Sequence, residues 1–385
     1  MKKILYVASK VKLHLNLFHV PYLLRLKEEG YEVHVCASND YGEGESCAIP
    51  GCDVFYDIPF HRIPVHPTNL RSFFRLRRIL RENHYDIIHC HTPTGAALTR
   101  LAVLGKFRKN TKVVYTAHGF HFYKGASPFN WLVYYPAEKM LSRLTDVIIT
   151  INEEDYQLAK KWTWTDVRFF RGVGIDLNRF TGNDEDVRSI LRKELNIPEE
   201  SILLIFAGEM SWRKHQDFLI RTVALLNSSA DVKLVMAGEG AYLKKYRNLA
   251  QKLRIDDSII FLGFRGDVDY LMKASDIYVS SSRQEGLPVN IMEAMATGLP
   301  VVCFNIRGNK DLVENGKGGF LVKFDDQEAF VKRLNELASD SELRNRMGLY
   351  NKKASKNLER TRLINDMMKI YEELLNNKTG IANEK

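Results

Sequence analysis

No apolar run in this sequence is long enough to cross a membrane. Apolar residues make up 45% of the 385 positions, but none of their runs approaches the ~20 residues of a transmembrane helix. The opening MKKILYVAS is similar to the start of a signal peptide, yet Lys10 and Lys12 end its apolar stretch early. We therefore expect a first β-strand here, in a cytoplasmic protein.

Cysteine is scarce, and its spacing fits neither a disulfide framework nor a zinc site. The five cysteines are odd in number and include no CxxC pair. Such a set predicts reduced thiols in a cytosolic protein. Neither His118 nor His121 stands near a Cys, Asp or Glu set with metal-ligand spacing, so we expect no metal site.

A dinucleotide-binding fingerprint is also missing. Gly238-Glu239-Gly240 follows an apolar run and precedes a helical segment, but the third glycine of GxGxxG is absent. This absence disfavours a nicotinamide dehydrogenase. A tight strand-to-helix turn is the plain alternative for these glycines.

Positive charge is in excess but unevenly placed. The net charge is +9 and the pI is about 9.1. Residues 1–175 hold 24 Lys and Arg against 16 Asp and Glu, a surplus of eight, whereas the remainder holds 32 against 31. This asymmetry indicates an anionic partner for the first half. A basic nucleic-acid-binding protein is one alternative, but no recognition-helix or base-stacking motif supports it, so we expect no nucleic-acid partner.

Two series of apolar, strand-like runs alternate with helix-length segments. Continuous apolar strands separated by helices predict parallel sheets covered on both faces. Two such series predict an α/β protein with two Rossmann-like, doubly wound parallel-sheet domains. The first series is KILYVA, YEVHVCA, DIIHCH, KVVYTAH and DVIITIN, and the second is SILLIFAGE, VKLVMAGEG, SIIFLGF, DIYVSS, LPVVCF and GGFLVKF.

The junction between the two domains is expected in RFFRGVGIDLNRF, which a polar stretch follows. We place an N-terminal domain at residues 1–175 and a C-terminal domain at 176–355. Residues 356–385 include a helix with an apolar stripe, which must pack on another element. We expect this helix to cross back to the N-terminal domain.

The stretch SSRQEGLPVNIME carries two carboxylates eight residues apart, Glu285 and Glu293. A strand-like run precedes it and a helix ending at Gly298 is predicted after it, so Glu285 falls in a strand-to-helix loop. Pro288 suits the first turn of that helix. A helix start at the carboxyl edge of a parallel sheet is where open α/β proteins bind anions. The two carboxylates suit the two ends of an elongated ligand.

Other polar residues follow strands in the same way. Arg213 and Lys214 come after SILLIFAGE at the start of the next helix, where they suit a diphosphate; a solvated helix end is the plain alternative. His118 follows KVVYTA, and His121 is its competitor. A lone histidine is more often structural, but its place at the carboxyl edge of a parallel strand makes a functional role an equal alternative.

EGLPVNIMEAMATGLPVV resembles the signature of the retaining glycosyltransferases of the GT-B fold, family four. The order of AGE…RK, MAGEG, FLGF and SSRQEGLP is similar to that family's second domain, and HCHTP, YTAHGFHF and DVIITIN resemble its first. The match thus covers most of the chain. It is closest to the branch that builds bacterial capsule and exopolysaccharide, and it implies two domains that face each other across a cleft.

The resemblance implies a role for each matching residue. Glu293 is expected to hold the ribose hydroxyls of a UDP-sugar. Glu285 and, from the N-terminal domain, His118 are expected at the sugar. The other expected contacts are the backbone N–H groups of Gly286 and Leu287 at the sugar and diphosphate, Arg213 and Lys214 at the diphosphate, and Phe264 and Arg265 at the base.

Two positions depart from the family pattern. The arginine that usually follows the glycine after the first strand of the second domain is Glu209 here, so Arg213 is expected to replace it. The first loop, SKVKLHLNLFH, lacks the family's glycine pair. The contact of this loop with donor phosphate therefore does not carry over from the family.

The resemblance also implies the reaction. A hexose or N-acetylhexosamine passes from a UDP-sugar to a saccharide on a polyprenyl diphosphate, with retention of configuration and with neither metal nor other cofactor. Positive groups near the departing diphosphate, Lys214, Arg213 and the helix N-terminus, would stabilise the charge that develops there, which is usually the largest catalytic term. A nucleotide-sugar epimerase on the same fold is the alternative enzyme, and the Glu-x7-Glu spacing argues against it. No motif encodes the sugar, the acceptor or the linkage.

Residues 69–81, NLRSFFRLRRILR, predict a basic amphipathic helix. An ordinary surface helix is the plain alternative. Together with the basic surplus of this half, the segment predicts peripheral contact with the anionic inner face of the cell membrane. The apolar side of this helix is expected to hold Leu70, Phe73, Leu76 and Leu80, and its basic side Arg71, Arg75 and Arg78. In a separate aromatic segment, the side chains expected at the level of the lipid headgroups are Phe129, Trp131, Tyr134 and Tyr135.

Overall fold

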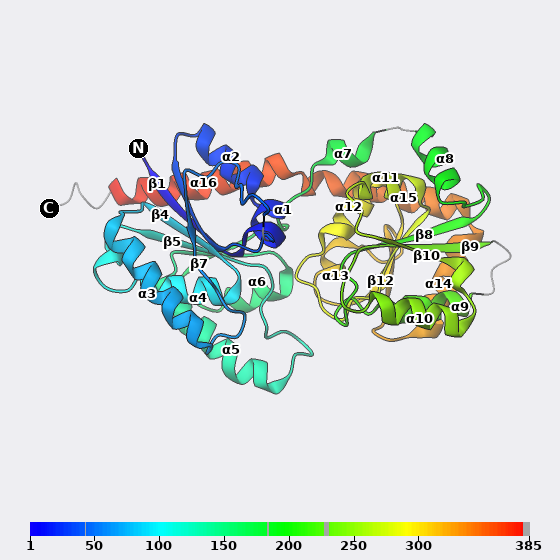
Figure 1. The fold of residues 1–385 in the computed structure, drawn as a ribbon, viewed down its shortest axis with the longest axis horizontal. Coiled ribbons are helices and arrows are strands. Elements are labelled where there is room, and N and C mark those ends of the chain that lie inside the picture. The colour runs from blue at the N-terminus through cyan, green and yellow to red at the C-terminus, as the bar shows by residue number, and fades with distance from the viewer. Residues whose placement is uncertain (43, 183–184, 227–230, 380–385) are drawn as a thin grey trace. The chain divides into compact units, whose positions relative to one another are not determined.

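The structure is a computed structural model that describes all residues except 43, 183–184, 227–230 and 380–385 (Figure 1). The chain forms two compact units, each with its own parallel sheet. Unit 1 comprises Met1–Val173 and Thr361–Lys385, and unit 2 comprises Gly174–Arg360. The chain therefore leaves unit 1 within the RFFRGVGIDLNRF segment and returns to it near the start of its last helix.

Unit 1 is built on a seven-stranded sheet of order β3-β2-β1-β4-β5-β6-β7. All of its pairings are parallel, and the strand order reverses at β1, which is the doubly wound arrangement. The strands are β1 (Lys3–Lys10), β2 (Glu32–Ser38), β3 (Val54–Asp57), β4 (Ile87–His91), β5 (Lys112–Ala117), β6 (Val147–Thr150) and β7 (Asp166–Phe169).

Helices cover both faces of this sheet. The chain enters the first of them through a π-helical turn, η1 (Val11–Leu15), which is a rare conformation often found at functional sites. The others are α1 (Asn16–Phe18), α2 (Val20–Glu28), α3 (Pro67–Glu82), α4 (Pro93–Ala102), η2 (Lys106–Arg108), α5 (Pro128–Leu141), η3 (Ser142–Leu144), α6 (Glu153–Ala159) and α16 (Arg360–Thr379).

The last helix, α16, is part of the core of unit 1. Its apolar stripe, which includes Leu363, Met367 and Tyr371, is buried in one cluster with Ile4 and Val33 of the sheet. The Tyr371 hydroxyl also meets His89 Nδ1 at 2.5 Å. The amphipathic pattern of the C-terminal segment is therefore satisfied by unit 1.

Unit 2 is built on a six-stranded parallel sheet of order β10-β9-β8-β11-β12-β13, which reverses at β8. A parallel strand with helices on both sides is apolar along its whole length, and β8 is buried at every position. The strands are β8 (Ile202–Ala207), β9 (Val232–Ala237), β10 (Ile259–Gly263), β11 (Ile277–Ser280), β12 (Val301–Phe304) and β13 (Gly319–Val322).

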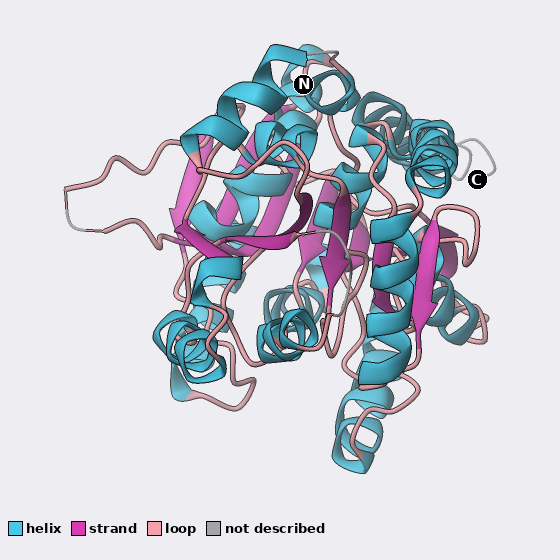
Figure 2. Cartoon of the chain, turned by 90° about the vertical axis from the view of Figure 1, so that its right-hand side faces the viewer, coloured by secondary structure: helices cyan, strands magenta, loops and turns pink. Residues whose placement is uncertain are grey.

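Helices also lie on both faces of the second sheet (Figure 2). The helix after β11 begins directly after Pro288, one residue later than expected, and it ends at Gly298, whose φ of 92° suits glycine. The helices are α7 (Leu177–Thr181), α8 (Glu185–Glu194), α9 (Gln216–Ala224), α10 (Leu243–Leu253), η4 (Asp256–Ser258), α11 (Val268–Ala274), α12 (Val289–Thr297), α13 (Asn309–Leu312), α14 (Gln327–Ser339), α15 (Ser341–Ser355) and η5 (Lys356–Leu358).

These observations confirm the predicted α/β class with two doubly wound sheets, because every predicted run contains a strand. Strands β3 and β7 were not predicted. Both are four-residue edge strands that are only half-buried, so they lack the continuous apolar run of a central strand. No helix in the part of the chain that is described could span a bilayer.

The prediction of which residues form the apolar side of the helix at 69–81 is wrong in part. The face of α3 that packs on unit 1 holds Ser72, Leu76 and Ile79, whereas Leu70 is 61% exposed. Leu70 therefore lies on the solvent side with the arginines. On α5, Tyr134 and Tyr135 pack against the core instead of facing solvent.

Candidate functional site

The loops after β8 and β9 approach each other so closely that only glycine fits. A Cβ on Gly238 would lie 2.0 Å from the carbonyl oxygen of Gly208, and a Cβ on Gly240 would lie 2.3 Å from that of Met210. Both glycines have φ near 150°, a region open to glycine. The Gly-Glu-Gly sequence therefore serves backbone packing and fixes the start of the Arg213 loop.

Glu285 lies between two cations at the carboxyl edge of the second sheet. Lys214 Nζ is 2.6 Å from Glu285 Oε1, and Arg213 Nη1 is 3.1 Å from Oε2. Glu285 and Lys214 are buried, whereas the Arg213 side chain is partly exposed. The structure therefore brings together three of the residues that the sequence predicted as catalytic.

The cations keep Glu285 ionised. Burial alone would raise the pKa of this carboxyl, but the nearby charges of Lys214 and Arg213, with hydrogen bonds from Lys214 and Ser282, outweigh burial and hold the pKa below its usual range. The site therefore carries a net positive charge from two cations and one carboxylate. An anionic ligand suits this balance.

Several residues that the sequence did not single out hold this cluster in place. Ser281 Oγ donates to the carbonyl oxygens of Lys214 (3.1 Å) and His215 (2.7 Å). The buried Arg307 donates from Nε to the carbonyl oxygen of Glu285 at 3.3 Å. A Cβ on Gly308 would meet the Gly286 carbonyl oxygen at 2.6 Å. These ties join three loops far apart in sequence, and no local pattern signals them.

The start of α12 presents backbone donors beside Glu285. Gly286 and Leu287 precede the helix, and neither backbone N–H donates a hydrogen bond to another described residue. The N-terminus of a helix carries partial positive charge and suits phosphate. The predicted N–H contacts of Gly286 and Leu287 are thus available to a ligand.

Glu293 lies on α12, in the second turn after Pro288, and its environment is unlike that of Glu285. Burial raises the pKa of Glu293 to about 7, although the charges of Arg179 and Arg360 act in the opposite direction. This carboxyl is therefore about half protonated at neutral pH. Such a group can accept a hydrogen bond from a hydroxyl once it is ionised.

The two residues predicted at the base differ in how free they are. Phe264 follows β10 and is 76% exposed, so its ring is open to stacking. Arg265 is held by Asp267, with contacts of 2.7 and 2.6 Å, and by Glu194 at 3.5 Å. Arg265 is therefore a fixed side chain whose charge is already matched.

Glu209, which stands where the family usually has arginine, is exposed at the end of β8. Its carbonyl oxygen accepts a hydrogen bond from Gln216, while Arg213, four residues on, reaches Glu285. The geometry thus places an arginine at this cluster from a later position in the same loop. The substitution of Arg213 for the family arginine remains a prediction.

His118, the remaining predicted catalytic residue, lies in unit 1 at the carboxyl end of β5. Its Nε2 atom meets His91 Nδ1 at 3.2 Å. The next loop is tied down, because Phe120 N donates to the buried Asp155 at 2.9 Å. His121, the competitor, stacks instead on Tyr134 with ring centroids 4.9 Å apart. His118 is therefore the better placed of the two for a ligand.

His118 belongs to a cluster of five histidines. The others are His14 and His19, which flank α1, and His89 and His91 of β4. Burial lowers the pKa of His14 to about 4 and that of His118 to about 3. These rings are uncharged near neutral pH, so His118 meets a ligand as a hydrogen-bonding group and not as a cation.

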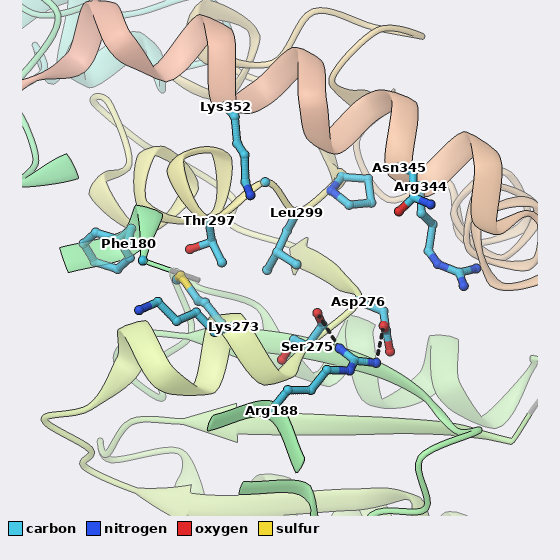
Figure 3. Close-up of a pocket in the computed structure, with 14 residues that line it drawn as sticks. Phe180, Arg188, Lys273, Ser275, Asp276, Thr297, Leu299, Arg344, Asn345 and Lys352 are labelled. Atoms are coloured by element: carbon cyan, nitrogen blue, oxygen red, sulfur yellow. Dashed lines mark hydrogen bonds and ion pairs between the residues drawn. The ribbon is translucent and has the colours of Figure 1, made fainter. Parts of the chain in front are cut away.

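A separate pocket lies at the opposite edge of the second sheet (Figure 3). This pocket of about 380 Å³ is lined by residues that precede β11 and β12, such as Asp276 and Pro300, and by Lys273 and Lys352. None of the predicted site residues lines it. This pocket is therefore distinct from the site predicted from the sequence.

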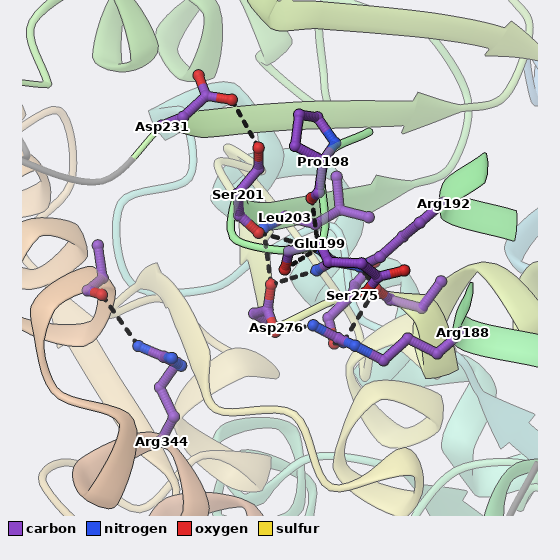
Figure 4. Close-up of polar contacts among 12 residues, drawn as sticks. Arg188, Arg192, Pro198, Glu199, Ser201, Leu203, Asp231, Ser275, Asp276 and Arg344 are labelled. Carbon is purple, nitrogen blue, oxygen red and sulfur yellow. Dashed lines mark hydrogen bonds and ion pairs between the residues drawn. The ribbon is translucent and has the colours of Figure 1, made fainter. Parts of the chain in front are cut away.

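The polar groups beside this pocket form a structural network (Figure 4). Arg188 and Arg192 of α8 pair with the two oxygens of Asp276 at 2.9 and 2.7 Å. The buried Arg192 also donates to the carbonyl oxygens of Pro198, Glu199 and Ser201 at 3.0 Å. The network fastens α8 to the sheet, and Asp276 is already neutralised.

Two family models match the chain, one in each unit. The model described as Glycosyltransferase Family 4 matches residues 22–163, and the model described as Glycosyl transferases group 1 matches residues 187–354. A protein of Bacillus subtilis (strain 168) that is named as the glycosyltransferase EpsD is 39% identical to this chain over 373 residues, which is 96% of each chain. A UDP-Gal:alpha-D-GlcNAc-diphosphoundecaprenol alpha-1,3-galactosyltransferase of Escherichia coli is 28% identical over 71% of this chain and 72% of its own.

Solved structures share the fold. Anabaena Alr3699/HepE, crystallised with UDP and glucose, superposes with a TM-score of 0.76 at 20% identity, covering 97% of this chain and 100% of that one. Sucrose-phosphate synthase from Thermosynechococcus elongatus superposes with a TM-score of 0.80 at 16% identity, and the match covers 97% of this chain and 99% of that one. The resemblance seen in the sequence is confirmed: the chain belongs to the GT-B glycosyltransferases that join a family 4 domain to a group 1 domain.

Proposed function

We propose that this glycosyltransferase moves a hexose or N-acetylhexosamine from a UDP-sugar to a saccharide on a polyprenyl diphosphate during polysaccharide assembly. The observation that carries the proposal is the buried Glu285 held between Lys214 and Arg213 at the start of α12. The E. coli relative is named for a UDP-sugar donor and a diphosphoundecaprenol acceptor. Its similarity to this chain supports the same two substrate classes here.

Donor binding follows from the groups around Glu285. The diphosphate lies against Lys214, Arg213 and the free N–H groups of Gly286 and Leu287. The Glu285 carboxylate accepts hydrogen bonds from hydroxyls of the sugar and, without donor, keeps the Lys214 ammonium in place. Glu293 accepts from the ribose hydroxyls, and the exposed Phe264 stacks on the base.

Transfer proceeds with retention and without metal. The bond between the anomeric carbon and the diphosphate oxygen breaks, and negative charge grows on that oxygen beside Lys214 and Arg213. Preorganised cations at such a point are usually a large catalytic term. The acceptor hydroxyl attacks the same face of the sugar, and its proton passes to the departing phosphate oxygen. UDP and the lengthened saccharide are the products.

The test is acceptor-dependent release of UDP. A panel of UDP-sugars is incubated with the protein and a polyprenyl diphosphate that carries N-acetylhexosamine, and the linkage is read by NMR. We expect an α-linked product from an α-linked donor, with activity unchanged by EDTA. An inverted anomer contradicts retention, and loss of activity that Mg²⁺ restores contradicts the metal-free mechanism. Conversion of the UDP-sugar without an acceptor indicates an epimerase instead.

A further inference from the structure

Three histidines from separate segments of unit 1 point at one another. His14 lies in the π-helical turn η1, His19 directly precedes α2, and His118 follows β5. One ring nitrogen of each lies within 4.8 Å of the others. The ring centroid of His14 lies 4.7 Å from that of His19 and 5.3 Å from that of His118.

Two of these rings have buried nitrogens that receive no hydrogen bond from, and donate none to, the described residues. Neither His14 Nδ1 nor His19 Nε2 forms a hydrogen bond with any residue that the structure describes, and His19 is 2% exposed. A buried polar atom left without a partner costs about 1–3 kcal/mol and calls for an explanation. A ligand shared by the three rings supplies one.

The far sides of two rings are already fixed. The Nδ1 atom of His19 meets the Tyr6 hydroxyl at 2.9 Å, and His118 meets His91 at 3.2 Å. Histidines that bind metals typically use the second ring nitrogen in such a bond, which sets the tautomer and orients the ring. The arrangement leaves His19 Nε2 free to face the other two histidines.

We propose that His14, His19 and His118 form a binding site for one divalent transition metal ion of the zinc class. The three donors are imidazole nitrogens, and the group within the described residues includes no carboxylate or thiolate. Imidazole suits Zn²⁺, Co²⁺, Ni²⁺ and Cu²⁺, whereas Mg²⁺ and Ca²⁺ need oxygen ligands. Three histidines with an open fourth position form a known zinc arrangement.

The site can close on an ion with small movements. Bonds of ~2.0–2.1 Å in a tetrahedron require nitrogens about 3.4 Å apart. The ring nitrogens, which lie within 4.8 Å of one another, must therefore approach by roughly 1.5 Å, and side-chain rotations can supply this movement. A cavity of about 20 Å³, large enough for one water, adjoins His19 and His118, although His14 is not among its lining residues. His14 and His118 are partly exposed, so the ion has a way in.

Metal binding should oppose sugar transfer, an inference that rests on the proposed function. His118 uses its available ring nitrogen either for the metal or for the sugar. The family resemblance expects His118 at the sugar, so an ion bound to His14, His19 and His118 withholds this side chain from the donor, and zinc acts as an inhibitor. Transfer itself needs no metal, because Lys214 and Arg213 in unit 2 supply the positive charge at the diphosphate.

Direct binding tests the site without any assumption about activity. Full-length protein is freed of metal by chelator dialysis and titrated with Zn²⁺ against a competing dye, and with Co²⁺ by visible absorption. We expect one tight equivalent and a tetrahedral Co²⁺ spectrum. His14→Ala and His118→Ala should each weaken Zn²⁺ binding by at least the ~10–100-fold that the loss of an outer partner costs.

Matched controls use histidines outside the cluster. His84 is exposed, and His61 and His66 stack with centroids 3.7 Å apart, so His84→Ala and the double variant His61→Ala/His66→Ala test surface binding. Equal Zn²⁺ binding by His14→Ala, His118→Ala and wild type, all with wild-type melting temperatures, would overturn the site. Binding that both cluster variants lose, with transfer insensitive to zinc, would uphold the site and overturn the sugar contact of His118.

Discussion

Glu285 and Glu293 lie in one loop-helix segment, yet their surroundings shift their pKa values in opposite directions. Lys214 and Arg213 outweigh burial at Glu285 and lower its pKa. At Glu293 burial prevails and raises the pKa to about 7. Carboxyl groups that are driven apart in this way usually have different tasks. A carboxylate with a lowered pKa, Glu285, suits the sugar and the cations, and a carboxyl that titrates near neutral pH, Glu293, suits ribose.

Glu293→Ala should weaken donor binding more than it slows transfer. Ribose contacts are equally good in the ground state and the transition state, so their loss raises KM and leaves kcat nearly unchanged. Losing a hydrogen bond to a charged group costs roughly 1.5–3 kcal/mol. Isothermal titration with UDP measures this effect. UDP binding as tight as that of wild type would remove Glu293 from the ribose site.

UDP affinity should also depend on pH through Glu293. Ribose hydroxyls donate to the ionised carboxylate, so below pH 7 the protein must release a proton before it binds. Affinity should therefore rise with pH, by up to about tenfold per unit below pH 7, and level off above it. Glu293→Gln has no proton to lose and isolates the part of the profile due to UDP itself. Identical profiles for wild type and this variant would refute the assignment.

Lys214→Ala should lower kcat sharply, because the charge that Lys214 stabilises is largest in the transition state. One such donor is typically worth about 10²–10³ in rate. Steady-state kinetics at saturating donor measures the loss, and Lys244→Ala on the exposed face of α10 is the matched control. Unchanged turnover would assign the role to Arg213 or to the start of α12 alone.

Residues marked by a local pattern could be predicted from the sequence, whereas residues brought together by long-range packing could not. The strand-to-helix pattern indicated Glu285, Lys214 and Arg213, which the fold brings together. Nothing near Arg307 in the sequence signals its bond to the Glu285 backbone. The histidine cluster was not predicted either, because contacts distant in sequence create it. His14 and His19 are five residues apart, but His118 lies far along the chain from both, so no local pattern joins the three.

At the scale of elements, strands buried on both faces were predictable and edge strands were not. The residues of β8 are all buried and form an unbroken apolar run, whereas β3 pairs with the sheet on one side only and includes an exposed Asp57. The partly wrong prediction for the packed face of α3 has a similar cause, because hydrophobic pattern alone decided it. Periodicity predicted an amphipathic helix, but the packed face includes Asn69 and Ser72, whose side chains bond to the preceding loop.

The core role of α16 leads to a stability prediction. Met367 is buried among residues of the first sheet and α2, so Met367→Ala leaves a cavity in unit 1. Such substitutions usually cost about 2–5 kcal/mol. Urea unfolding followed by circular dichroism measures the loss, and Lys369→Ala on the solvent side of α16 is the control. Equal stability of both variants would mean that α16 docks only weakly.

At the scale of the whole molecule, the charge surplus of the first half coincides with exposed apolar side chains. Leu70 and Phe74 of α3 and Phe129 and Leu132 of α5 are all more than 60% exposed. Both helices contact α4, so they lie on the same side of unit 1 (Figure 1). Arginines beside exposed apolar groups are typical of surfaces that bind anionic membranes. This surface is our candidate for the membrane contact that a lipid-linked acceptor requires.

Full-length protein should therefore co-sediment with vesicles that contain anionic lipid and dissociate from them as salt rises. A basic side chain near such a surface contributes about 1 kcal/mol, so replacing Arg71, Arg75 and Arg78 by Glu should weaken binding at least ~100-fold and leave UDP affinity unchanged. The matched control reverses three exposed lysines of unit 2, Lys244, Lys245 and Lys252 on α10. If both triple variants lose binding equally, net charge and not this surface holds the protein on the vesicles. Wild type that ignores anionic vesicles at low salt would show that α3 is an ordinary surface helix, and the acceptor would then have to be reached in another way.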